Sequence, residues 1–248
     1  MKNEVKIHEV DRSLNNRRSF LKLSGLALAS AGLVIAGCSK NDDDEGPDDT
    51  SFPGVRNGVF DLGSGDFGVL TYAYALEQLE ADFYTKVVNS TNFGTAFNDI
   101  ERQVLTDLYH HEVIHRDFFK AALSGALPNP SAQLLPTLAF NYGSLNFNSR
   151  TDVLATAKAL EDTGVAAYNG AGKLIKNADY LLLAGKIVSV EARHASAIRS
   201  LINPNSKDFA GDDIISTTTG LDVAKDPSKI LPIAGGFITT KFTATYLP

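Results

Sequence analysis

Two stretches decide the fold: LTDLYHHEVIHRDFF, residues 105–119, and IVSVEARHASAIRSL, residues 187–201. Each contains one Glu-x-x-His step, from Glu112 to His115 and from Glu191 to His194. Steps of three and four residues then give one stripe in each stretch: Leu105, Leu108, Glu112, His115 and Phe119; Ile187, Glu191, His194, Ile198 and Leu201. Because residues at this spacing share one face of an α-helix, the pattern predicts two helices that turn both Glu-His pairs inward.

Two further segments share a second pattern. Their stripes have identical spacing: Leu70, Ala73, Glu77, Glu80 and Tyr84; Leu154, Ala157, Glu161, Gly164 and Tyr168. The match indicates an internal repeat of two helix pairs. Glu80 is the ambiguous position because its counterpart is Gly164, so it ranks below Glu77 as an extra or alternative ligand.

The charges of these stripes point to metal ions. Four ionised, unpaired carboxylates in a bundle core would cost several kcal/mol each, which a marginally stable fold cannot absorb. Two divalent cations balance the four glutamates, and two neutral imidazoles complete the set without adding charge. The sequence therefore predicts a dinuclear site within a four-helix bundle.

A competing interpretation treats each residue singly. Glutamates on helices are usually solvated, and Glu-to-His spacing also suits a surface ion pair. That interpretation would turn every apolar stripe outward together with its glutamate, which disfavours it. His110 and His111 fall off the stripe and are interpreted as surface or hydrogen-bonded histidines. Tyr84 and Tyr168 are either packing residues or hydrogen-bond donors within the site.

On these residues the chain resembles the ferritin-like di-iron and di-manganese carboxylate superfamily. It resembles in particular the bacterial secreted ferritin-like domain branch of that superfamily, which is related to bacterioferritin, rubrerythrin and manganese catalase. The resemblance covers roughly residues 66 to 201. It implies the following roles: Glu77 and Glu161 as single-helix carboxylates, Glu112 and Glu191 as bridging carboxylates, His115 and His194 as imidazole ligands, and Tyr84 and Tyr168 as phenols that hydrogen-bond a ligand carboxylate.

The expected fold is all-α, a ferritin-like four-helix bundle of two antiparallel hairpins. Helices are predicted near residues 66–89, 98–124, 151–176 and 178–202, with Asn98 and Glu101 spaced as a capping box and Asn203-Pro204 ending the last helix. The proline-containing segment 125–150 is expected to be the single long crossover. The expected domain is residues 66–202, and residues 203–248 form a tail of irregular or short β structure, with extended stretches near 214–219 and 236–244.

The N-terminus predicts export. Residues 16–22, NRRSFLK, followed by an apolar run to Ala36, resemble a twin-arginine signal peptide covering residues 1–37. The run ends in a sequence similar to a lipobox, so we expect lipidation of Cys38; a membrane-spanning anchor is disfavoured by the short apolar run. Residues 38–65 are expected to be the lipidated Cys38 and an acidic, disordered tether, with a turn-rich entry to the bundle around residues 52–65. The expected location is the outer membrane, on its periplasmic face or at the cell surface.

Composition excludes several functions. The net charge of −6 and the lack of a basic or phosphate-binding motif argue against nucleic acid. Cys38 is the only cysteine, so the sequence provides no disulfide and no rubredoxin-type cysteine pairs for electron transfer. No pattern indicates an oligomeric state, and the anchor, tether and tail argue against iron storage in a large shell.

The predicted site leaves each ion an open position where O2, peroxide or water binds. The first hypothesis is oxidative chemistry, as a di-iron ferroxidase or peroxidase or as a dimanganese catalase-like enzyme. Iron and manganese accept the same ligands, so the sequence does not separate them. The alternative is a non-enzymatic envelope or stress-related lipoprotein with a ferritin-like domain. The sequence identifies neither a particular substrate nor a reductant.

Overall fold

The computed structural model describes residues 49–248. The predicted export signal, Cys38 and the acidic part of the tether lie outside the described residues. None of the helices within residues 49–248 combines the length and the hydropathy that crossing a membrane requires.

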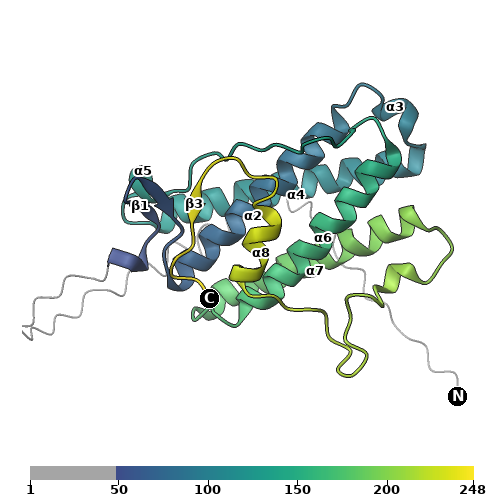
Figure 1. The fold of residues 1–248 in the computed structure, drawn as a ribbon. Helices are drawn as coiled ribbons and strands as arrows, with labels where there is room; N and C mark the ends of the chain where they lie inside the picture. The colour runs from purple at the N-terminus through teal and green to yellow at the C-terminus, as the bar shows by residue number, and fades with distance from the viewer. Residues whose placement is uncertain (1–48) are drawn as a thin grey trace, which may run out of the picture. The chain divides into compact units, whose positions relative to one another are not determined.

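Four long helices form a bundle, which confirms the predicted fold class (Figure 1). Their bounds are α2 Gly65–Val88, α4 Asp99–Ala126, α6 Arg150–Gly172 and α7 Ala178–Ile202. α2 packs chiefly against α4, and α6 packs chiefly against α7, so each pair is one hairpin. A four-residue helix, α3 (Phe93–Ala96), lies in the connection between α2 and α4.

Three of the four long helices begin at a side-chain cap, whereas Ser64 at the start of α2 makes no such bond. Asn98 and Glu101 form the predicted capping box of α4, in which each side chain bonds the other residue's backbone N–H, both at 3.0 Å. Ser149 accepts a bond from the backbone of Asp152 at the start of α6, and Asn177 caps α7. Only the end of α6, at Gly172, falls more than two residues from its predicted position.

The crossover between the hairpins covers residues 127–149 and contains one short helix, α5 (Pro130–Gln133). Gln78 of α2 anchors it from inside the fold. Its side-chain amide donates to the carbonyl of Pro136 at 3.3 Å and accepts from the backbone of Leu138 at 2.9 Å. The bond from Leu138 satisfies a backbone N–H that would otherwise be buried without a partner.

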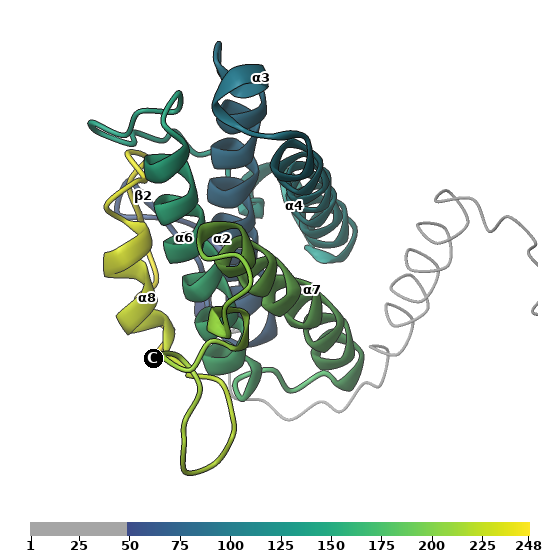
Figure 2. The ribbon, with the colours of Figure 1, turned by 90° about the vertical axis from the view of Figure 1, so that its right-hand side faces the viewer.

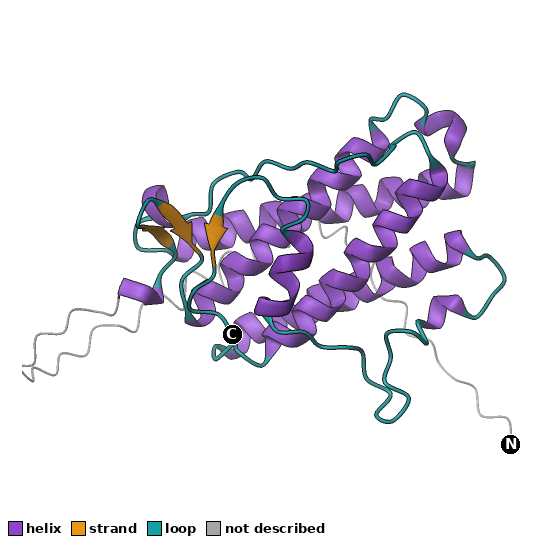
Figure 3. Cartoon of the chain, viewed as in Figure 1, coloured by secondary structure: helices purple, strands orange, loops and turns teal. Residues whose placement is uncertain are grey.

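A small sheet joins the two ends of the described chain at one end of the bundle (Figure 3). β1 (Gly54–Arg56) and β2 (Val59–Asp61) form an antiparallel hairpin after the 3-10 helix η2 (Asp49–Ser51), and β3 (Phe242–Thr243) pairs parallel with β2. Asp61 is buried where they meet and accepts bonds from the backbone of Gly63 and from Thr243 and Thr245.

The tail contains the expected extended structure, as β3 and a bridge between Ile215 and Asp222. It also contains helix α8 (Pro227–Ala234) and the 3-10 helix η3 (Asp208–Ala210), which the sequence patterns did not predict. α8 packs on α2 and α6 (Figure 2). Covered by α4, α6, the crossover and α8, α2 is buried on every face from Thr71 to Ala81.

Candidate metal centre

The bundle brings six of the predicted site residues together at its centre. α2 and α6 each contribute one glutamate, and α4 and α7 each contribute a Glu-x-x-His pair: Glu77, Glu161, Glu112 with His115, and Glu191 with His194. All four glutamates have no solvent-exposed surface. Their stripes of Leu, Ile and Phe pack inward beside them, so the helical periodicity that buries the apolar residues also buries the carboxylates.

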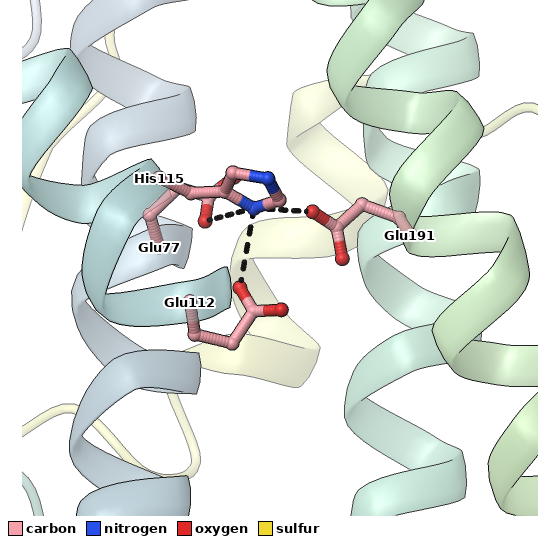
Figure 4. A group of neighbouring side chains, drawn as sticks. All are labelled: Glu77, Glu112, His115 and Glu191. Carbon is pink, nitrogen blue, oxygen red and sulfur yellow. Dashed lines mark ion pairs between the residues drawn. The ribbon is translucent and has the colours of Figure 1, made fainter. Parts of the chain in front are cut away.

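His115 faces three carboxylates from three helices (Figure 4). Its Nδ1 lies 2.8 Å from Oε1 of Glu191, 3.4 Å from Oε2 of Glu77 and 3.6 Å from Oε2 of Glu112. The side chain of His115 keeps 12% of its surface exposed. Of the six residues, it lies nearest the solvent.

His194 repeats this arrangement in the other half of the site. Its Nδ1 lies 2.8 Å from Oε1 of Glu112, 3.2 Å from Oε2 of Glu191 and 3.5 Å from Oε2 of Glu161. Glu112 and Glu191 therefore each turn one oxygen toward His115 and the other toward His194. The two glutamates thus belong to both of two four-residue clusters that could each hold a metal ion: Glu77, Glu112, His115 and Glu191; Glu112, Glu161, Glu191 and His194.

The donor atoms face one another largely without hydrogen bonding. Six buried atoms of the cluster have no hydrogen-bond partner: Oε2 of Glu77, both carboxylate oxygens of Glu112, Nδ1 of His115, Oε2 of Glu161 and Oε1 of Glu191. The ligand atoms within each cluster lie within 4.8 Å of one another. Buried polar atoms are normally paired, so this convergence is unexplained by the protein alone. Carboxylate and imidazole donors at this spacing could hold a metal ion.

Two tyrosines hold the carboxylates that come from α2 and α6. The hydroxyl of Tyr84 on α2 donates to Oε1 of Glu161 on α6 at 2.5 Å, and the hydroxyl of Tyr168 on α6 donates to Oε1 of Glu77 on α2. Each tyrosine thus crosses to the other hairpin. Because Oε1 is held, the Oε2 atom of each glutamate is left to face the cluster.

The electrostatics of the metal-free site show strong coupling. Burial disfavours the charged form of His115 and His194, but the surrounding carboxylates outweigh it and raise the pKa of both imidazoles. Burial and the neighbouring Glu191 raise the pKa of Glu112, whereas contacts with both imidazoles lower the pKa of Glu191 despite its burial. In the metal-free protein, protons therefore supply the positive charge that the carboxylates need, and a bound cation must displace them.

Glu80 lies outside both clusters. It is buried, and its Oε1 points at Gly164, where an added Cβ would approach it to 2.8 Å. Burial and the four site glutamates raise the pKa of Glu80 well above its usual value. It lines a small cavity of about 30 Å³ that residues of the tail, Ile233, Ala234 and Phe237, help to close. The structure thus gives Glu80 a place beside the site rather than among the converging donors.

The two histidines that fall off the stripe behave differently from each other. His110 is exposed and its ring lies beside Tyr109. His111 is also exposed, but its Nδ1 lies 2.8 Å from Nε2 of the buried His194. The sequence patterns did not predict this contact, because His111 does not share the inward face of its own helix. The one sequence signal that could have indicated it is the position of His111 next to Glu112.

Comparison with known proteins agrees with this geometry. The family model of the ferritin-like domain matches residues 65–204, more than half of the chain, and its bounds enclose all four long helices. A search of curated proteins finds no match.

Proposed function

The chain belongs to the ferritin-like domain family, and from this premise we propose that it binds two iron or manganese ions and uses them in oxidative chemistry with O2 or peroxide. The observation that carries the proposal is the division of the Glu112 and Glu191 oxygens between His115 and His194. One ion would be held by Glu77, His115 and the two shared carboxylates. The other would be held by Glu161, His194 and the same two carboxylates.

When two ferrous ions are bound, they supply the two electrons that, with two protons, reduce one hydrogen peroxide to two water molecules. The protein's own residues keep the carboxylates ordered for this chemistry. Tyr84 and Tyr168 orient the two single-helix glutamates, and the apolar stripes keep bulk water away from the buried oxygens. The partly exposed edge of His115 marks the side from which a small oxidant reaches the site.

The test is metal content after anaerobic loading, measured by elemental analysis for the wild type and for Glu112→Gln. Glutamine keeps the shape of the side chain but replaces one bridging oxygen with an NH2 group, which cannot serve as a ligand. We expect two iron or two manganese ions per chain in the wild type, fewer in the variant, and peroxide consumption that falls with them. Asp107→Asn, an exposed carboxylate on the same helix, is the matched control and should change neither. Two ions per chain in Glu112→Gln would refute the bridging role.

The complete burial of the four glutamates also favours a second candidate, in which metal only holds the helices of a binding or structural protein together. Metal binding to the folded state alone would then raise the stability of the protein. The same loaded preparation separates the two functions. Two ions per chain, a higher Tm and no turnover of O2 or peroxide would establish the structural role.

We further propose that the protein is exported and anchored to the outer membrane through a lipid on Cys38, facing the periplasm or the cell surface. The twin-arginine pattern, the apolar run and the lipobox-like end of residues 1–37 support this proposal. Mass spectrometry of the mature protein tests it, because lipidation adds a defined mass to a chain that begins at Cys38. A mature chain that retains residues 1–37 would refute it.

A further inference from the structure

The two halves of the candidate metal centre differ in what lies behind their imidazoles. Nε2 of His194 lies 2.8 Å from Nδ1 of His111, and the planes of the two rings are 14° apart, so the rings are nearly parallel. His194 therefore has its two ring nitrogens fully engaged: Nδ1 toward the carboxylates and Nε2 toward His111. For His115, no residue among 49–248 bonds Nε2.

The internal repeat shows that this difference is specific to one half. Glu112 and Glu191 are 79 residues apart, and so are His115 and His194. The residue at the same offset from His111 is Val190, a half-buried side chain that cannot accept a hydrogen bond. The repeat therefore has an imidazole at this position of α4 and an apolar side chain at the matching position of α7.

The direction of the bond follows from its surroundings. Nδ1 of His194 faces three carboxylates and must offer its lone pair to a cation there, so a neutral His194 ring carries its proton on Nε2. Nε2–H then donates to Nδ1 of His111. A hydrogen bond of this kind fixes the tautomer and the orientation of a ligand imidazole and makes it a stronger ligand.

We propose that His111 is a positioning residue that accepts the Nε2–H of His194 and makes the metal position at His194 tighter than the position at His115. The inference rests on the proposed function, because it concerns the affinity of the two positions for metal. The exposed location of His111 also means that the residue acts from outside the apolar core, where its substitution leaves no cavity.

The experiment is anaerobic titration of the whole chain with Co²⁺, a probe whose absorption reports each bound ion, in the wild type, His111→Ala, His111→Gln and Val190→Ala. We expect two binding steps in the wild type. In His111→Ala the tighter step weakens by about 10–100-fold, the loss typical of removing such a partner, while the other step is unchanged. His111→Gln, whose amide oxygen can accept the same N–H, restores much of the affinity, and Val190→Ala alters neither step.

A second readout needs no metal. The Nε2–H of His194 should give a slowly exchanging NMR resonance in the wild type and in His111→Gln, and this resonance should lose its protection in His111→Ala. If both Co²⁺ binding steps are unchanged, or are equally weakened, in His111→Ala, the role of His111 is refuted, whereas the proposed function is not. A wild type that binds fewer than two Co²⁺ would overturn the proposed function, and the affinity difference with it.

Discussion

Replacing Tyr84 with phenylalanine isolates one hydrogen bond that holds the two hairpins together. Tyr84 on α2 is fully buried, and its hydroxyl reaches Oε1 of Glu161 on α6 at 2.5 Å. The substitution removes one oxygen and keeps the aromatic ring, which packs edge-on against Phe83 with centroids 5.0 Å apart. Any loss of stability therefore reports the hydrogen bond rather than the packing.

The expected loss of stability in Tyr84→Phe follows from the hydrogen bond that Glu161 loses. Tyr84 is the only hydrogen-bond donor to Oε1 of Glu161 among the described residues, and Oε2 already has none. A hydrogen bond to a charged group contributes about 1.5–3 kcal/mol, and an unpartnered buried acceptor bears its full desolvation cost. For a chain of this size, each kcal/mol of lost stability lowers the Tm by about 2–4 °C. The expected decrease in Tm is therefore about 3–12 °C.

The assay is urea denaturation of the metal-free protein, followed by helical circular dichroism, because bound metal would add its own stabilisation. Tyr72→Phe provides the control. Tyr72 lies on the same helix and is equally buried, but its hydroxyl has no hydrogen-bond partner among residues 49–248. We expect Tyr72→Phe to change the free energy of unfolding by less than about 0.5 kcal/mol or to raise it slightly. Equal losses in the two variants would refute the assigned role of the Tyr84 bond.

Two further predictions concern parts of the fold around the site. Burial acts to raise the pKa of Asp61, but hydrogen bonds from Gly63, Thr243 and Thr245 hold it below its usual value. The contribution of the Asp61 carboxylate to stability is thus present above the unfolded pKa of about 3.9 and is lost as the pH falls through the folded pKa. Asp61→Asn should therefore lower the free energy of unfolding by about 1.5–3 kcal/mol at neutral pH, and urea denaturation should show the difference closing below about pH 4. Gly164→Ala would place a methyl group 2.8 Å from Oε1 of Glu80, whose burial hinders the side chain from moving away. The clash should cost about 1–3 kcal/mol, against the roughly 1 kcal/mol by which alanine is favoured over glycine within α6, so we expect a net loss of stability. A double-mutant cycle with Glu80→Ala should recover most of that loss, and additive losses would show that the close approach is not the cause.

The helices could be predicted because their patterns are local. Apolar stripes and capping residues such as Asn98 act within a few turns of chain, and they placed seven of the eight ends of the long helices within two residues. α8 could not be found in this way. It has eight residues, begins with Pro227 and contains Pro232, so its helix exists through packing on α2 and α6 rather than through its own propensity.

The candidate site likewise contains residues that the sequence could predict and a contact that it could not. The six converging residues lie on inward stripes, but so does Glu80, so the six are selected by periodicity together with the repeat, in which Gly164 is the counterpart of Glu80. His111 lies on the exposed side of α4 and reaches His194 only because α7 passes beside it, 83 residues along the chain. Contacts between such distant residues depend on how two helices cross, which no spacing within one helix records.

Glu80 and Gly164 show why two equivalent positions of the repeat carry side chains of different size. Residues 80 and 164 occupy the same place in the two copies of the pattern, and the structure puts them in contact with each other. Two glutamates here would bring two more carboxylates together in a region that already holds four, and two side chains of that size would collide. One side must therefore be small, and glycine leaves room for the carboxylate from the other helix. His111 and Val190 differ between the copies as well, on α4 and α7 rather than on α2 and α6. The six converging residues keep the symmetry of the repeat, while Glu80 with Gly164 and His111 with Val190 break it, so the two halves of the candidate metal centre have different environments.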